Sequence, residues 1–276
     1  MSSYARCIYC NSEDSTNYMV PVSLKNRGGR IGYMCNCCAG KVDSYYDKNN
    51  ENKGKTIGNP CTYGIELETM HSSYEAKAHL YQYRFLPTYD CTVDIEYKSP
   101  VFQNMKSIPH LCKEIEKMMN TRDLIIDSNC GTHFHVGYRG WINEWTMRTI
   151  YRDRAIYTRL FSPLSEVVNN DPERAREIFG RAFQDTQWAY PIRHNSWVDT
   201  HENFINVMHD NTFEFRLMFF KNANQYMRGV RLCDKITKCI VENLGMHYDD
   251  ISSNTDKLMK RVDLVAKKLV KLYEKA

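Results

Sequence analysis

Apolar and polar residues alternate along three short stretches of the chain, and this alternation predicts β-strands. In CTYGIELETM, residues 61–70, Ile65 and Leu67 fall on the same strand face. The stretches NCGTHFHVGY (129–138) and NTFEFRLMFF (211–220) repeat the pattern with large apolar residues at every second position. Because successive side chains of a strand point to opposite faces, each stretch predicts one apolar face and one polar face.

The polar faces of these strands carry pairs of ionisable residues. The pairs are Glu66 with Glu68, His133 with His135, and Glu214 with Arg216. Carboxylates two residues apart on a strand lie about 7 Å apart, so they repel each other unless a cation lies near them. Glutamate and histidine are metal ligands, and arginine binds phosphate or carboxylate oxygens. Each pair alone also suits a half-exposed antiparallel strand, but the three together predict a metal-binding face.

A fourth segment, YDCTVDIEYKSP (89–100), adds the acidic residues Asp90, Asp94 and Glu96. Ser99 and Pro100 end the element. Glu96 is a candidate ligand for a further metal, although an acidic surface loop explains the spacing equally well.

Helical periodicity predicts the elements that cover the apolar sheet face. The predicted helices lie within 101–120, 141–161, 171–183, 226–245 and 255–276. Asp171 is a predicted N-cap with Pro172 at the first helical position. The last helix carries six lysines beside an apolar stripe; it is suited to an acidic partner or an anionic membrane, but docking of the stripe on the domain is the favoured interpretation.

Composition narrows the class of protein. The 276 residues allow one large core plus a small module, and a net charge of +4 gives no sign of a nucleic-acid partner. The sequence contains neither a long apolar membrane segment nor the apolar core of a signal peptide, so we expect a cytoplasmic protein without a membrane partner. The odd total of eleven cysteines argues against a disulfide framework.

Five of the cysteines lie near the N-terminus and predict a zinc module. Cys7 and Cys10 are followed, after 24 residues, by Cys35 and Cys38. Two Cys-x-x-Cys pairs at this separation fit one tetrahedral structural Zn²⁺ site, whereas reduced cysteines without metal are the alternative. The intervening residues suit a hairpin with its turn at 27–30. We therefore predict a zinc-ribbon-like module at 1–45, a polar linker at 46–58 and a catalytic domain at 59–276.

Taken in chain order, YGIELET, DCTVDIEYKSP, CGTHFHVG and TFEFR resemble the amidoligase family of the glutamine synthetase and glutamate–cysteine ligase superfamily. The resemblance implies an α+β fold, in which a curved antiparallel sheet forms a funnel covered on one face by helices. It also implies ATP-dependent joining of a carboxylate to an amine through an acyl phosphate. The substrates would be small molecules, such as amino acids or polyamines, or peptides and proteins, and the zinc module is a candidate for recruiting a protein target.

The resemblance assigns roles to the polar residues. Glu66, His133 and Glu214 would hold the Mg²⁺ or Mn²⁺ that bridges the phosphates of ATP. Glu68 and Glu96 would hold a second metal, His135 would contact phosphate or substrate, and Arg216 would stabilise the transferring phosphoryl group. Further candidate contacts to substrate or nucleotide are Arg193 and Asn206.

Two other functions fit parts of the sequence. His133 and His135 form a His-x-His pair that suits a metallohydrolase, but this interpretation gives no role to Glu66 or Glu68. A non-catalytic adaptor that binds a nucleotide or peptide is the third alternative.

Overall fold

The computed structural model describes most of the chain after residue 60. The described ranges are 4–6, 13–15, 19–24, 30–35, 61–88, 93, 95–102, 104–138, 141–187, 189–193, 202–208, 212–244 and 255–276. For the strands before residue 36, the structure describes only the course of the backbone.

The chain folds as an α+β protein around a six-stranded antiparallel sheet, which confirms the predicted fold class. The curved funnel of the amidoligase resemblance stays a prediction. The strand order is β11 (Ile205–Met208), β12 (Thr212–Phe215), β10 (Thr132–Tyr138), β5 (Cys61–Thr69), β8 (Ile95–Lys98) and β7 (Leu86–Thr88).

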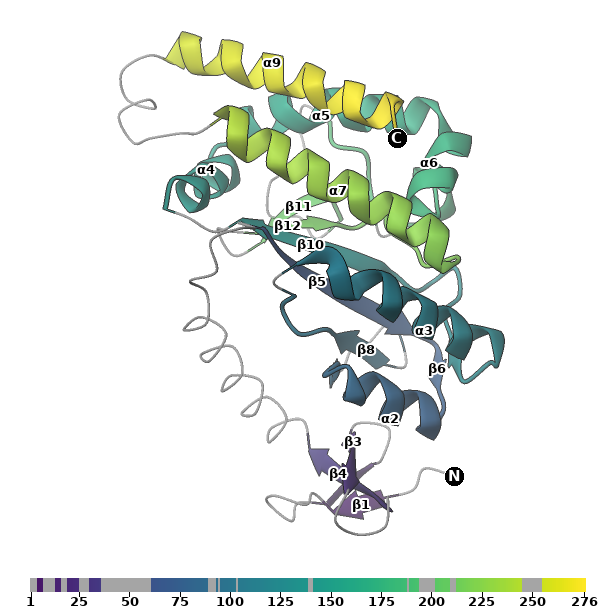
Figure 1. Ribbon diagram of the computed structural model, residues 1–276. Coiled ribbons are helices and arrows are strands. Elements are labelled where there is room, and N and C mark those ends of the chain that lie inside the picture. The colour runs from purple at the N-terminus through teal and green to yellow at the C-terminus, as the bar shows by residue number, and fades with distance from the viewer. Residues whose placement is uncertain are drawn as a thin grey trace. The chain divides into compact units, whose positions relative to one another are not determined.

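The contacts within the chain group it into two compact units. Unit 1 contains most of β5 with β7, β8 and two helices that are coloured blue in Figure 1. These helices are α2 (Tyr74–Gln82) and α3 (Ile108–Asn120), and α3 follows a short 3-10 turn, η3 (Met105–Ser107). Three small sheets pair β1 (Tyr4–Arg6) with β2 (Glu13–Ser15), β3 (Met19–Leu24) with β4 (Arg30–Cys35), and β6 (His71–Ser72) with β9 (Leu124–Ile125).

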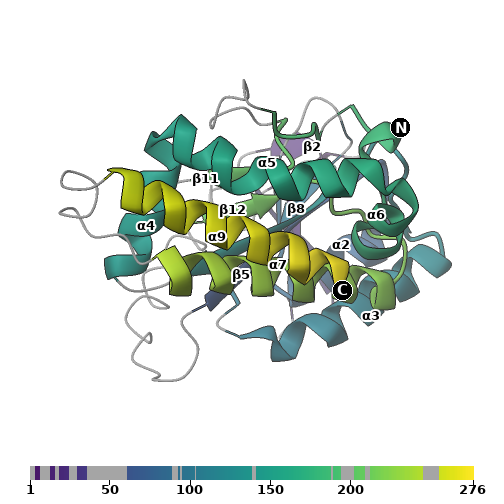
Figure 2. The same cartoon turned by 90° about the horizontal axis from the view of Figure 1, so that it is seen from above.

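Unit 2 combines β10, β11 and β12 with a layer of helices. The helices are α4 (Trp141–Arg152), α5 (Arg154–Asn170), α6 (Pro172–Phe179), α7 (Ala223–Leu244) and α9 (Thr255–Glu274), with a 3-10 turn, η4 (Phe183–Asp185), after α6. Helix α7 contacts β10, and α9 lies against both α5 and α7 (Figures 1 and 2). The predicted docking of the C-terminal helix is therefore confirmed, because Leu258, Val262 and Leu269 are buried, although Leu264 points to solvent with 60% of its surface exposed.

The predicted alternation of the strands is confirmed. On β10, Phe134 and Val136 are fully buried, and on β12 so are Phe213 and Phe215. The strand predicted over 211–220 ends earlier than expected, because the chain turns after Phe215.

The single helix predicted over 141–161 was wrong, because the structure has two helices that meet at Asp153. Asp153 takes up an extended conformation, and its carboxylate accepts hydrogen bonds from the backbone N–H groups of Ala155 and Ile156. These bonds satisfy donors that have no partner inside the new helix, so Asp153 begins α5 as an N-cap. The predicted N-cap at Asp171 is confirmed, since its side chain accepts from the N–H of Arg174.

A buried polar bond joins distant parts of the chain within unit 2. The hydroxyl of Tyr63, at the start of β5, donates to Asp234 of α7 over 2.8 Å, although the two residues are 171 positions apart. Asp234 also accepts from Lys238 over 2.9 Å. These two donors offset the cost of burying the carboxylate of Asp234.

The described residues test only part of what the sequence predicts for the N-terminal region. The hairpin is confirmed, because β3 and β4 pair antiparallel from Met19 opposite Cys35 to Leu24 opposite Arg30. Cys7, Cys10, Cys38 and the linker at 46–58 lie outside the described residues, and for Cys35 the backbone alone is described. The zinc module and the domain boundary therefore stay predictions. Within the described ranges, every helix is too short or too polar to cross a membrane.

Candidate functional site

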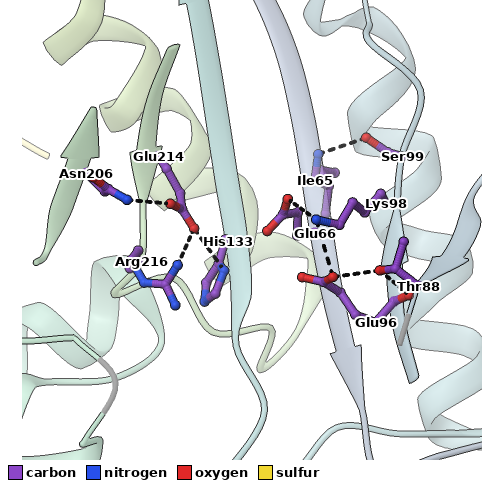
Figure 3. A network of polar contacts seen from close by, with 10 residues as sticks. All are labelled: Ile65, Glu66, Thr88, Glu96, Lys98, Ser99, His133, Asn206, Glu214 and Arg216. Atoms are coloured by element: carbon purple, nitrogen blue, oxygen red, sulfur yellow. Dashed lines mark hydrogen bonds and ion pairs between the residues drawn. The ribbon is translucent and has the colours of Figure 1, made fainter. Parts of the chain in front are cut away.

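Glu214 forms the centre of a buried polar cluster in unit 2. It lies on β12 directly opposite His135 of β10 and Asn206 of β11. Its Oε1 atom is 3.1 Å from Nδ1 of His133 and 2.5 Å from Nη1 of Arg216. Its Oε2 atom accepts from Nδ2 of Asn206 over 3.2 Å. We call His133, Asn206, Glu214 and Arg216 the Glu214 cluster; Figure 3 shows its side chains converging on the carboxylate.

The surroundings of Glu214 keep its carboxyl group ionised. Burial alone would raise its pKa, but the hydrogen bond and charge of His133 and the charges of Arg216 and His135 outweigh burial and lower the pKa to about 2. Glu214 and His133 are almost completely buried, with 1% and 4% of their surfaces exposed. A fixed negative charge in such a place favours a nearby cation.

The local sequence explains why these groups meet. Phe213 and Phe215 hold one face of β12 in the core, so Glu214 between them must point to the other face. The same alternation on β10 directs His133 and His135 to the face opposite Phe134 and Val136. Antiparallel pairing then brings the polar residues of the two strands together.

A second cluster occupies unit 1, where a lysine lies between two carboxylates. The ammonium of Lys98 on β8 is 3.1 Å from Oε1 of Glu66 and 3.4 Å from Oε2 of Glu96. Thr88 of β7 donates to Oε2 of Glu96 over 2.6 Å. We call Glu66, Thr88, Glu96 and Lys98 the Lys98 cluster; they appear on the right of Figure 3.

In the Lys98 cluster, burial and neighbouring charges shift the pKa values of Glu96 and Lys98. Burial and the neighbouring Glu66 raise the pKa of Glu96, and the hydrogen bond from Thr88 and the charge of Lys98 oppose the rise. Burial would lower the pKa of Lys98, but attraction to Glu66 and Glu96 outweighs it and raises the pKa. An ammonium group of the protein itself therefore relieves the repulsion between the carboxylates of Glu66 and Glu96.

Glu66, His133 and Glu214 form a potential metal-binding triad. Each offers one ligand atom, and these atoms all lie within 4.8 Å of one another. The three residues come from β5, β10 and β12, which are consecutive strands of the sheet. Two carboxylates and an imidazole suit Mg²⁺ or Mn²⁺, and the imidazole shifts the preference toward Mn²⁺.

The remaining predicted site residues differ in their burial and in their partners. Glu68 is buried on β5 directly opposite Glu96 of β8, and His135 is half-buried. Asn206, a predicted contact to substrate or nucleotide, donates to Glu214, and its contact to a ligand stays a prediction. Arg193 is exposed. Asp90 and Asp94 lie outside the described residues.

Sequence reasoning missed Lys98 and Thr88. Lys98 is two residues after Glu96, and this spacing places both side chains on one strand face, so the sequence contained a usable signal. Thr88 reaches Glu96 only through the pairing of β7 with β8, which no local pattern revealed.

A comparison of this chain with protein-family models and with curated proteins finds no match. The resemblance to amidoligases therefore rests on the four motifs alone.

Proposed function

We propose that the protein is an ATP- and metal-dependent ligase that joins a carboxylate to an amine. The observation that carries this proposal is the Glu214 cluster, in which a buried, ionised carboxylate contacts both an imidazole and a guanidinium. This combination of metal-ligand and phosphate-binding groups suits a metal–nucleotide complex. The ordered motifs of the amidoligase resemblance point to the same chemistry.

The donor groups fit the metal ions that the proposal requires. Glu66, His133 and Glu214 would hold one Mg²⁺ or Mn²⁺. Glu68 and Glu96 would hold a second ion, and the attraction of Lys98 to Glu96 supports a preference for positive charge at that position. When bound, such ions supply positive charge that offsets the negative charge of the phosphates.

The reaction would proceed in two balanced steps. An oxygen of the substrate carboxylate attacks the γ-phosphorus of ATP, the bond to the β-phosphate oxygen breaks, and ADP leaves. The nitrogen of the amine then attacks the acyl carbon of the acyl phosphate, inorganic phosphate leaves, and the nitrogen loses a proton. The guanidinium of Arg216 would stabilise the charge on the transferring phosphoryl group, and His135 would contact phosphate or substrate.

The first test is calorimetric titration of the protein with ATP in Mg²⁺, in Mn²⁺ and with a chelator. We expect binding that needs the metal and that weakens at least tenfold in Glu214→Gln, which removes the fixed charge but keeps the shape. The matched control is Glu177→Gln, the same change at an exposed side chain of α6, which should bind like the parent. Equal binding by parent and Glu214→Gln would refute the assignment of Glu214.

The second test separates a ligase from the other functions. A ligase releases ADP and phosphate only when both a carboxylate and an amine are supplied. Hydrolysis of esters, amides or phosphoesters without ATP would instead favour the His-x-His metallohydrolase, and nucleotide binding without turnover would favour an adaptor.

A further inference from the structure

A groove of about 430 Å³ runs between α7 and α9 in unit 2. The two helices lie side by side and run in opposite directions in both views (Figures 1 and 2). The ammonium of Lys268 on α9 donates to Oδ1 of Asn243 on α7, and this bond places the two residues opposite each other. None of the residues that line the groove belongs to the Glu214 or Lys98 cluster.

The groove is strongly basic. Five lysines line it, and Glu242 is its one acidic lining residue among the described residues. On α9 three of these lysines recur at intervals of three and four residues, which places them on one face of the helix. The five, which we call the groove lysines, are Lys235, Lys238, Lys268, Lys271 and Lys275.

Within the part of the chain that the structure describes, most of this positive charge has no ion-pair partner. Lys238 forms an ion pair with Asp234, and Lys268 bonds to the neutral amide of Asn243. Within the described ranges, Lys235, Lys271 and Lys275 form no ion pair. Because like charges on neighbouring turns of a helix repel each other, an anion in the groove would relieve that repulsion.

The groove also offers an apolar surface between its rows of lysines. Cys239 of α7 and Leu272 of α9 are half-buried in its wall. Burial is the main cause that raises the pKa of the Cys239 thiol, so the thiol is neutral at pH 7 and behaves as a small apolar group. A ligand that fills the groove would therefore meet positive charge on both sides and an apolar surface between them.

We propose that this groove binds an acidic peptide segment of a protein partner. The lysine row from Lys268 to Lys275 is about 10 Å long at the rise of an α-helix, and about three residues of an extended peptide cover that length. Such a segment can direct carboxylates to the groove lysines and an apolar side chain to Cys239 and Leu272. A ligand that carries phosphate groups alone would leave the apolar surface unused, and a flat bilayer surface does not enter a groove.

The test uses fluorescence anisotropy with the full chain and a labelled peptide of sequence Glu-Leu-Glu-Glu-Leu-Glu. The groove variant is Lys271→Glu with Lys275→Glu. Its matched control is Lys260→Glu with Lys267→Glu, which makes the same change of charge on exposed residues of α9 outside the groove. We expect the groove variant to bind at least tenfold more weakly than the parent and the control to bind within about threefold of it. A peptide with glutamine in place of glutamate should not bind.

Further measurements keep the proposal open to refutation. Thermal melting verifies that the groove variant folds, and Lys271→Gln with Lys275→Gln provides a milder change that should weaken binding in the same direction. Equal loss in the groove variant and the control would show attraction by net charge alone and would overturn the proposal. Failure of the parent to bind the peptide would also overturn it, as would tighter binding of phosphatidylserine vesicles, single-stranded oligonucleotide or polyphosphate through the same lysines.

Discussion

The Nδ1 atom of His133 lies 3.1 Å from Oε1 of Glu214, and both side chains are buried on the polar face of neighbouring strands. The ionised carboxylate therefore stabilises the fold as well as presenting a charge to a ligand. Both stability and ligand binding must therefore be measured for any substitution of Glu214, since a protein that has lost stability can also lose binding.

Glu214→Gln should lower stability in a manner that depends on pH. The pKa of Glu214 is held at about 2, below its ordinary value of 4.5, so the ionised form favours the folded state above pH 4.5. That contribution is lost as the pH falls from 4.5 toward 2. We expect the variant to be about 3 kcal/mol less stable than the parent at pH 7, because Arg216 loses a buried partner.

Urea unfolding at pH 7, 5, 4 and 3 measures this difference for Glu214→Gln and for the exposed control Glu177→Gln. The difference between parent and Glu214→Gln should shrink at the lowest pH values, and the control should match the parent throughout. A difference that stays constant over this range would show that the charge of Glu214 is not responsible.

Lys98→Met should strengthen the binding of divalent ions at the two proposed sites, one of which uses Glu66 and the other Glu96. The ammonium of Lys98 contacts both carboxylates, so it competes with a metal for them. Removal of this competitor should tighten Mn²⁺ binding about tenfold, a change worth about 1.4 kcal/mol. Electron paramagnetic resonance titration with Mn²⁺ measures the affinity, and Lys113→Met, at an exposed position of α3, is the control. Unchanged or weaker binding in Lys98→Met would mean that Lys98 does not compete with the metal.

Asp153→Ala should destabilise the protein by about 1 kcal/mol, because two N–H groups at the start of α5 lose their acceptor. Asp153→Asn keeps a side-chain oxygen that can accept the same bonds, so it should lose much less. Thermal melting of the two variants measures both losses of stability. Equal losses would show that the N-cap hydrogen bonds of Asp153 are not the cause.

Gly229→Ala should destabilise the protein. At a solvent-exposed position of a helix, by contrast, alanine is more favourable than glycine by about 1 kcal/mol. A Cβ atom at this position of α7 would lie 2.8 Å from the carbonyl oxygen of Ile178 and 2.7 Å from the sulfur of Met218. The backbone of α6 cannot yield as a flexible side chain does, so we expect a net loss of about 2 kcal/mol. A rise in the melting temperature would contradict the close packing of α6 against α7.

The four N-terminal cysteines predict one tightly held Zn²⁺ per chain. Elemental analysis of the purified protein should find this zinc, and Cys7→Ser with Cys10→Ser should lose it, because the site needs all four thiolates. Cys112→Ser, at a buried cysteine of α3, is the control and should keep the metal. Full zinc content in the double variant would exclude the predicted site.

The sequence predicted the parts of the fold that depend on local periodicity. Alternation placed Glu66, His133 and Glu214 on polar strand faces, and the structure confirms those faces. Helical spacing likewise predicted the stripe that docks α9. The break at Asp153 was missed because apolar residues continue at helical intervals through it, and a single capping side chain overrides that pattern.

Strand pairing set the limit of prediction at the candidate site. The contact of Thr88 with Glu96 and that of Asn206 with Glu214 depend on the register between strands, which a single sequence does not reveal. Lys98 was within reach of prediction, since it shares a strand face with Glu96. Its role as a cation between two carboxylates required the pairing of Glu66 opposite Lys98.

The hydrogen bond between Tyr63 and Asp234 bears on the order in which parts of the chain fold. The loop that must close before these residues meet spans 171 positions, and the entropy lost on closure grows with loop length. Helices α5, α7 and α9 form from local contacts, whereas the start of β5 must find α7 from far along the chain. We therefore expect the helices of unit 2 to form early and Tyr63 to reach its partner in a slower, later step.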